Sequence, residues 1–298
     1  MTTAVAIAVV LLVLSATNVW VHAGPRLSKP LGPRLGPRLS SGLVLGGVHL
    51  LTGPLAALVL LLIGRVAGLT WPQLGLGWQA LPRGVLAGTL AAVAVAIVYA
   101  AGVAIPLTRD AFRDTRYRLG LRGALYLSLV AIPLGTVLFE EVAFRGVLWG
   151  LLDRSFGVQS ATAVSAVIFG LWHVLPALDL ARTHTSVRGP GTAGRRRLVL
   201  TVLATMVFTA IAGVVFAELR RRTGSLVAPI GLHWATNGLG VLAAARVWAM
   251  TPGEVAAPGE LPPGELAAGE LAAGELAPGP VTPPSWQRVV ARLRSGRR

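Results

Sequence analysis

Six polar residues in the second half of the chain have the types and spacing that hydrolytic chemistry needs. They are two adjacent glutamates with an arginine close behind, and two histidines, one followed by an asparagine: Glu140, Glu141, Arg145, His173, His233 and Asn237. Carboxylates and imidazoles can act as general bases toward a water molecule, and imidazole and amide N–H groups can stabilise an oxyanion. The set suits hydrolysis of an acyl bond by an activated water.

The spacing around the glutamates separates their expected roles. Glu141 and Arg145 are four residues apart, so on a helix their side chains share one face and can form an ion pair. Glu140 points about 100° away from its neighbour, and the same arginine cannot serve it equally well. We therefore expect one carboxylate to be structural and the other to be free to react.

The two histidines have local patterns of the same kind. Phe169 and His173 are four residues apart, as are His233 and Asn237, so each pair should share a helix face. Three separate helices would then present polar groups to one another in the interior of a bundle. Prolines near these groups could kink the helices and admit water.

The composition around these residues is that of an integral membrane protein. Hydrophobic residues make up 54% of the 298 residues and charged residues only 13%, which excludes a cytosolic enzyme. We predict an all-α, polytopic transmembrane bundle of seven or eight spans. An unpaired carboxylate in mid-bilayer costs at least about 2.5–3.5 kcal/mol, so the adjacent glutamates require partners or a watery cavity. The seven apolar runs are Ala4–Val21, Leu43–Gly64, Gly84–Pro106, Gly123–Leu152, Ser160–Leu180, Leu198–Leu219 and Ser225–Met250.

The chain divides into three predicted regions. Residues 1–42 hold the first span and a basic linker that repeats Gly-Pro-Arg-Leu over Gly24–Leu39. Residues 43–250 form the membrane core. Residues 251–298 contain Gly-Glu-Leu repeats and a basic end, which predict a disordered tail.

Basic residues concentrate in alternate connections between the spans and in the tail, although the net charge reaches +15. This placement predicts topology signals and contacts with anionic lipids rather than nucleic acid binding. By the positive-inside rule, the N-terminus lies outside and the C-terminus in the cytoplasm. The strong preference for arginine over lysine, with the excess of Ala, Gly and Leu, is typical of GC-rich bacterial genes, so we expect a bacterial plasma membrane. The absence of cysteine excludes a thiolate nucleophile and Cys-ligated metals.

The three polar motifs, in this order, resemble those of the CPBP intramembrane proteases, which include the CAAX prenyl endopeptidases and the bacterial Abi proteins. Glu140 to Arg145 matches the family's Glu-Glu-x-x-x-Arg motif, Phe169…His173 its Phe-x-x-x-His motif, and His233…Asn237 its His-x-x-x-Asn motif. The resemblance covers about Leu121–Leu242.

The resemblance implies an all-helical fold with the site in a cavity between helices. Glu140 and His173 would activate the water, His233 and Asn237 would stabilise the oxyanion, and Glu141 and Arg145 would support the site. A zinc ion on Glu140, His173 and His233 is the alternative, since zinc hydrolases commonly use three such ligands. The chain lacks a His-Glu-x-x-His helix, and we favour a metal-free mechanism without a cofactor.

The sequence thus predicts an intramembrane endopeptidase that cleaves a peptide or protein tail entering from the membrane. Two alternatives stay open. A non-catalytic membrane partner or immunity protein could retain the family's site and act by binding. A proton-coupled transporter could use the same carboxylates and histidines as a relay, although no internal repeat of the transporter kind is apparent in the spans.

Overall fold

The computed structural model describes residues 1–27, 42–183 and 191–250, and these are helical with short connections. Most of the predicted linker and the whole tail at 251–298 lie outside the described residues, although α1 continues through the first residues of the linker. In chain order the elements are α1 (Thr3–Leu27), α2 (Gly42–Val66), η2 (Trp78–Ala80), α3 (Leu81–Ala104), η3 (Pro106–Phe112), η4 (Thr115–Tyr117), α4 (Leu121–Tyr126), η5 (Leu127–Val137), α5 (Leu138–Glu141), η6 (Val142–Leu148), α6 (Trp149–Trp172), α7 (Val174–Thr183), α8 (Gly191–Thr223), α9 (Val227–Trp234), η7 (Ala235–Leu239) and α10 (Gly240–Ala249).

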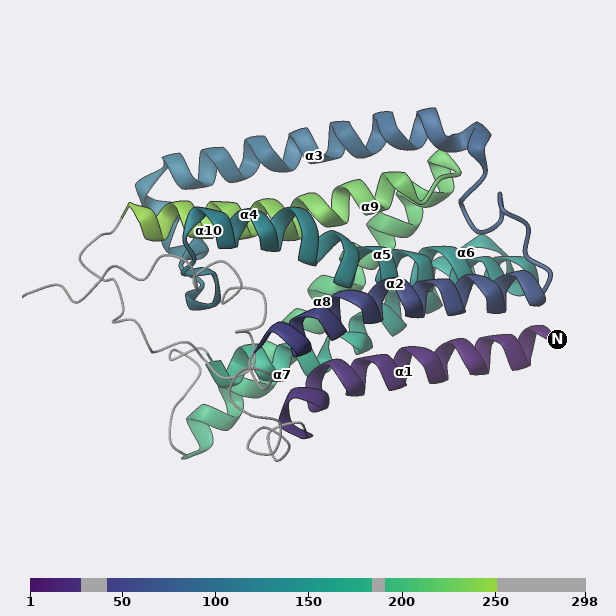
Figure 1. The fold of residues 1–298 in the computed structure, drawn as a ribbon, viewed down its shortest axis with the longest axis horizontal. Coiled ribbons are helices and arrows are strands. Elements are labelled where there is room, and N and C mark those ends of the chain that lie inside the picture. The colour runs from purple at the N-terminus through teal and green to yellow at the C-terminus, as the bar shows by residue number, and fades with distance from the viewer. Residues whose placement is uncertain (28–41, 184–190, 251–298) are drawn as a thin grey trace, which may run out of the picture.

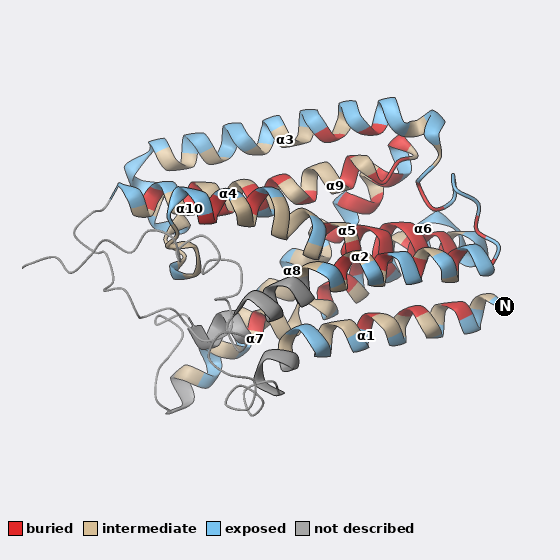
Figure 2. Ribbon diagram, viewed as in Figure 1, coloured by how far each residue is buried: buried red, intermediate tan, exposed pale blue. Residues whose placement is uncertain are grey.

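Four helical segments of the described chain are long and apolar enough to cross a membrane, namely Thr3–His22, Trp78–Ala104, Leu121–Leu178 and Gly194–Thr223. Leu50–Val66 is a shorter apolar helix. In the most apolar stretch of α3 only 11% of the residues are buried, and in that of α8 only 6%. The corresponding share within Leu121–Leu178 is 44%. Figure 2 shows the same contrast: α3 is mostly exposed, while buried residues gather around α5 and α6. Apolar helices exposed in this way are typical of an integral membrane protein.

The longest apolar segment reverses direction at Gly157, where φ is +77° and ψ is 168°. Glycine adopts this positive φ without a Cβ clash. The two arms pack antiparallel, as two contacts across the reversal demonstrate. The indole N–H of Trp149 donates to Thr162 Oγ1 at 3.2 Å, and Ser165 Oγ donates to the carbonyl of Phe144 at 3.0 Å. The predicted runs 123–152 and 160–180 are thus separate arms of a helical hairpin.

The helices run side by side along the long axis of the molecule, with α3 at one edge and α1 at the other (Figure 1). At one end of the bundle, Arg154 donates to Thr3 Oγ1 at 3.2 Å and to the carbonyl of Ala67 at 2.9 Å. At the opposite end, the indole of Trp248 donates to the carbonyl of Asp114 at 2.9 Å. Thr3, Ala67 and Arg154 therefore lie at one end of the bundle, and Asp114 and Trp248 lie at the other.

The first arm of the hairpin contains two π-helical stretches, η5 and η6, on either side of α5. Pro133 explains the first, because it has no N–H to donate and its ring clashes with the carbonyl four residues earlier. The helix opens there, and the N–H of Leu138 donates to the carbonyl of Pro133, five residues back. The effect of Pro133 is thus a widening of the helix that ends just before the two glutamates.

A close approach of α3 and α9 sets the position of the helix that carries His233. A Cβ on Gly231 would lie 2.8 Å from the Cα of Gly88, which is too close for any side chain. Small residues at such a crossing allow two membrane helices to pack backbone to backbone. The contact fixes α9 between α3 and the glutamate-bearing arm.

Candidate active site

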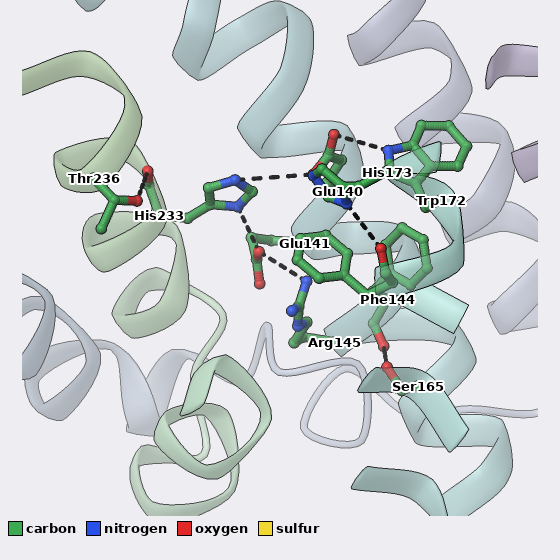
Figure 3. A network of polar contacts seen from close by, with 10 residues as sticks. Glu140, Glu141, Phe144, Arg145, Ser165, Trp172, His173, His233 and Thr236 are labelled. Carbon is green, nitrogen blue, oxygen red and sulfur yellow. Dashed lines mark hydrogen bonds and ion pairs between the residues drawn. The ribbon is translucent and has the colours of Figure 1, made fainter. Parts of the chain in front are cut away.

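Glu140 and Glu141 lie on the short helix α5 and are both buried, with exposed fractions of 5% and 0%. As adjacent residues of a helix, they point in different directions. Glu140 faces the second arm of the hairpin, and Glu141 faces Arg145 and α9 (Figure 3). The two carboxylates therefore have different partners, as the spacing predicted.

Arg145 forms the predicted ion pair with Glu141. Its Nη1 donates to Glu141 Oε1 at 3.1 Å, and both side chains are fully buried. The guanidinium lies over two aromatic rings, with Cζ 4.0 Å from the Phe169 centroid and 4.9 Å from that of Phe216. Arg145 Nε and Nη2 have no hydrogen-bond partner among the described residues, so π faces supply the rest of the stabilisation.

His233 joins the two glutamates. Its Nδ1 lies 2.7 Å from Glu141 Oε1, and its Nε2 lies 3.8 Å from Glu140 Oε2 (Figure 3). The short contact assigns the Nδ1 proton to the bond with Glu141, because a carboxylate accepts hydrogen bonds. The Nε2 edge of the imidazole is then directed at Glu140. Glu141 Oε1 accepts bonds from both Arg145 and His233 and holds the imidazole in place.

Phe216 is a component of the site that sequence reasoning missed. Its ring stacks on the imidazole of His233 with centroids 5.0 Å apart and planes at 22°, and it also contacts Arg145. It comes from α8, which carries none of the motifs. Only the three-dimensional packing of α8 against α9 brings this ring to the site.

Trp172 supplies a hydrogen bond that the three motifs did not indicate. Its indole N–H donates to Glu140 Oε1 at 3.1 Å. Asn18 of α1 in turn donates to the backbone carbonyl of Trp172 at 3.0 Å. The indole N–H of a tryptophan that lies partly inside a bundle usually bonds an acceptor, and this was the available signal. The first span therefore contacts the framework that orients Glu140.

His173 and Asn237 have other surroundings. His173 is half-buried at the end of α6, with Nδ1 2.8 Å from the carbonyl of Phe169. The Phe169 ring lies edge-on to both imidazoles, with centroids 4.6 Å from His173 and 6.0 Å from His233. Asn237, by contrast, is exposed, while His233 is buried.

The expectation that His233 and Asn237 share one face stays a prediction, because the two side chains differ in burial. Residues Ala235–Leu239 are π-helical. In a π-helix the hydrogen bonds span five residues rather than four. The one-turn spacing in the sequence is real, but the two side chains have different environments.

The arrangement does not fit the zinc alternative. Within residues 1–27, 42–183 and 191–250, no three histidine, aspartate or glutamate side chains are grouped closely enough to hold a metal ion. Of the expected ligands, Glu140 and His233 face each other at 3.8 Å, whereas His173 Nδ1 bonds the carbonyl of Phe169. We derive no step through a metal.

Comparison with known proteins identifies the segment that carries the site. Residues 122–239 match the sequence model described as type II CAAX prenyl endopeptidase Rce1-like. The match covers less than half of the chain, but it contains all three motifs and leaves α1, α2 and α3 outside. No curated protein and no solved structure gave a match. Residues 122–239 are thus a domain of the Rce1-like type II CAAX prenyl endopeptidase family, the CPBP and Abi group that the motifs resemble.

Proposed function

We propose that the protein is an intramembrane endopeptidase in which Glu140 activates the water that attacks a peptide bond. The observation that carries this proposal is the buried cluster of Glu140, Glu141, Arg145 and His233. Glu140 Oε2 is buried and has no hydrogen-bond partner among the described residues, and it faces the imidazole. A free carboxylate oxygen beside an oriented imidazole is what water activation requires.

The charges of the cluster balance when it holds one mobile proton. Two carboxylates and one guanidinium leave a single negative charge, and a buried charge is costly unless it is compensated. One proton shared between Glu140 and His233, whose facing atoms are 3.8 Å apart, makes the cluster neutral. With that proton on His233, Glu140 is a base and the imidazole has an Nε2–H to donate.

The reaction then follows in two steps. The water oxygen bonds to the carbonyl carbon while Glu140 takes its proton, and the His233 Nε2–H stabilises the oxyanion. Collapse of the tetrahedral intermediate breaks the C–N bond, and Glu140 delivers its proton to the leaving nitrogen. The ion pair of Glu141 and Arg145 holds the imidazole throughout.

The family resemblance adds His173 to water activation and Asn237 to oxyanion stabilisation. His173 shares the Phe169 ring with His233, which supports its place near the site. Asn237 is exposed, so the proposal relies on His233 for the oxyanion. The substrate would be a peptide or protein tail that reaches the cluster from the membrane, as the family implies.

We further propose seven spans, with the N-terminus outside and the C-terminus in the cytoplasm of a bacterial plasma membrane. The reversal at Gly157 and the alternating ends of the bundle support seven passes. The basic connections support the orientation. The region from 43 to 250 would form the membrane core around the protease domain.

The test compares membrane proteomes of cells that express the wild type, Glu140→Gln or Glu218→Gln. Glu218 is the matched control, because it is a membrane-border carboxylate whose partners are Arg221 and Arg222, away from the cluster. New protein termini should be present with the wild type and with Glu218→Gln, and absent with Glu140→Gln. Equal termini in all three would contradict the proposal. Biological activity retained by Glu140→Gln would identify a binding partner, and a lost pH-dependent flux would identify a transporter.

A further inference from the structure

We propose that a basic pocket at one end of the bundle binds the phosphate group of one anionic phospholipid. The pocket has a volume of about 320 Å³ and lies where α3 begins and α8 ends. Arg83, Arg221 and Arg222 line it, together with Gln79 and Thr223. The volume is near the lower limit of roughly 300–1,000 Å³ for small-molecule sites, which suits a headgroup.

The arginines that line the pocket carry more positive charge than the neighbouring carboxylate neutralises. Glu218 accepts two hydrogen bonds of 2.7 Å from Arg221 and one of 2.5 Å from Arg222. One carboxylate thus serves two guanidinium groups. Arg83 is exposed and has no ion-pair partner among the described residues. The pocket keeps a net positive charge for an anion from outside the chain.

A fourth arginine beneath the pocket does not change this balance. Arg220 is buried, and its Nη2 donates to the carbonyls of Pro72 and Gln73, both at 3.0 Å. Asp153 is the carboxylate whose charge acts on it. In and directly beneath the pocket, four guanidinium groups therefore stand against the carboxylates of Glu218 and Asp153. Arg220 also anchors the connection that carries Pro72 at the pocket wall.

The surroundings of the pocket indicate a lipid as the source of the anion. The two helices that meet there, α3 and α8, expose their apolar surfaces along most of their length. Trp78 and Trp71, on the connection that borders the pocket, are 79% and 49% exposed. Exposed tryptophans beside an apolar helix end are typical of the membrane interface. The pocket thus lies at headgroup depth, where acyl chains can follow the exposed face of α3.

The chemistry of the lining selects the class of lipid. Guanidinium groups bind phosphate oxygens with paired, charge-assisted hydrogen bonds. A net positive pocket disfavours a headgroup that carries a quaternary ammonium. A phosphodiester with an uncharged headgroup, such as phosphatidylglycerol, should therefore bind better than phosphatidylcholine.

The experiment measures lipid retention by native mass spectrometry of the full-length protein, titrated with phosphatidylglycerol or phosphatidylcholine. The test variant is Arg83→Gln/Arg222→Gln. The matched control is Arg195→Gln/Arg196→Gln, which removes the same charge from exposed residues at the opposite end of α8. The wild type and the control should retain one phosphatidylglycerol per chain. The test variant should bind it at least about tenfold more weakly, because two charge-assisted contacts are lost.

Three results would overturn the proposal. An equal loss in the control variant would mean that diffuse surface charge attracts the lipid. Equal retention of phosphatidylcholine by the wild type would mean that the pocket does not select an anion. Displacement of the lipid by millimolar inorganic phosphate would mean that the pocket takes a free anion. If the double variant fails to elute as a folded species in gel filtration, Arg83→Gln alone is compared with Arg196→Gln. Arg83→Gln should then bind phosphatidylglycerol more weakly than the wild type, and Arg196→Gln should bind it equally well.

Discussion

Replacement of Arg145 by methionine should be among the most destabilising single changes in the cluster. The side chain is fully buried, and its Nη1 is 3.1 Å from Glu141 Oε1. Methionine keeps a long apolar stem against Phe169 and Phe216, so most of the packing survives. The lost charge leaves the buried carboxylate of Glu141 uncompensated. Breaking such a pair from one side costs about 3–5 kcal/mol in the free energy of unfolding.

The assay is equilibrium unfolding in mixed micelles, followed by circular dichroism, for the wild type, Arg145→Met, Glu141→Gln and the double variant. The amide of a glutamine can still accept the bond from His233 through its oxygen. Because the double variant contains no unpaired charge, it should recover at least about 1–2 kcal/mol relative to Arg145→Met. An Arg145→Met protein within about 0.5 kcal/mol of the wild type would refute the reasoning. So would a double variant no more stable than Arg145→Met.

Three further tests, with four substitutions, probe the site, the reversal and the topology. Trp172→Phe removes the N–H bonded to Glu140 but keeps an aromatic ring. The cleavage rate in a membrane assay should fall about tenfold, while the free energy of unfolding should fall by only about 1 kcal/mol. An unchanged cleavage rate would show that this bond does not position the carboxylate. Gly157→Ala should destabilise the protein by about 1–2 kcal/mol, because its φ of +77° strains any residue with a Cβ, and a melting temperature equal to the wild type would contradict that strain. Because the chain has no cysteine, Gln79→Cys and Arg196→Cys provide single labelling sites; a membrane-impermeant maleimide should label the first in intact cells and the second only after permeabilisation, and the reverse pattern would invert the proposed topology.

Much of the cluster was predictable because its geometry is local. The four-residue spacing from Glu141 to Arg145 predicted their ion pair. Because Glu140 is adjacent to Glu141 on the helix, it was predicted to point elsewhere and to have other partners. The motif order indicated that His233 would approach from a later helix. The contact of His233 with both glutamates depends on how α9 packs against the first arm of the hairpin. Hydropathy alone does not predict how two helices pack.

The unpredicted features depend on distances between helices. Trp172 reaches Glu140 only because the chain reverses at Gly157, so a spacing of 32 residues becomes a contact. Phe216 stacks on His233 from a helix that carries no motif. Asn237 is exposed although it lies one turn after the buried His233, and the spacing of the two residues does not predict this difference in burial.

The most direct test of water activation by Glu140 is a single-turnover cleavage in water enriched in oxygen-18, with purified enzyme and a substrate identified from the new termini. The wild type should place one heavy oxygen in the new carboxyl group of the product. Glu140→Gln should form no product on the same timescale, although circular dichroism shows it folded. Product formed by Glu140→Gln at the rate of the wild type would contradict the assignment of this carboxylate as the base.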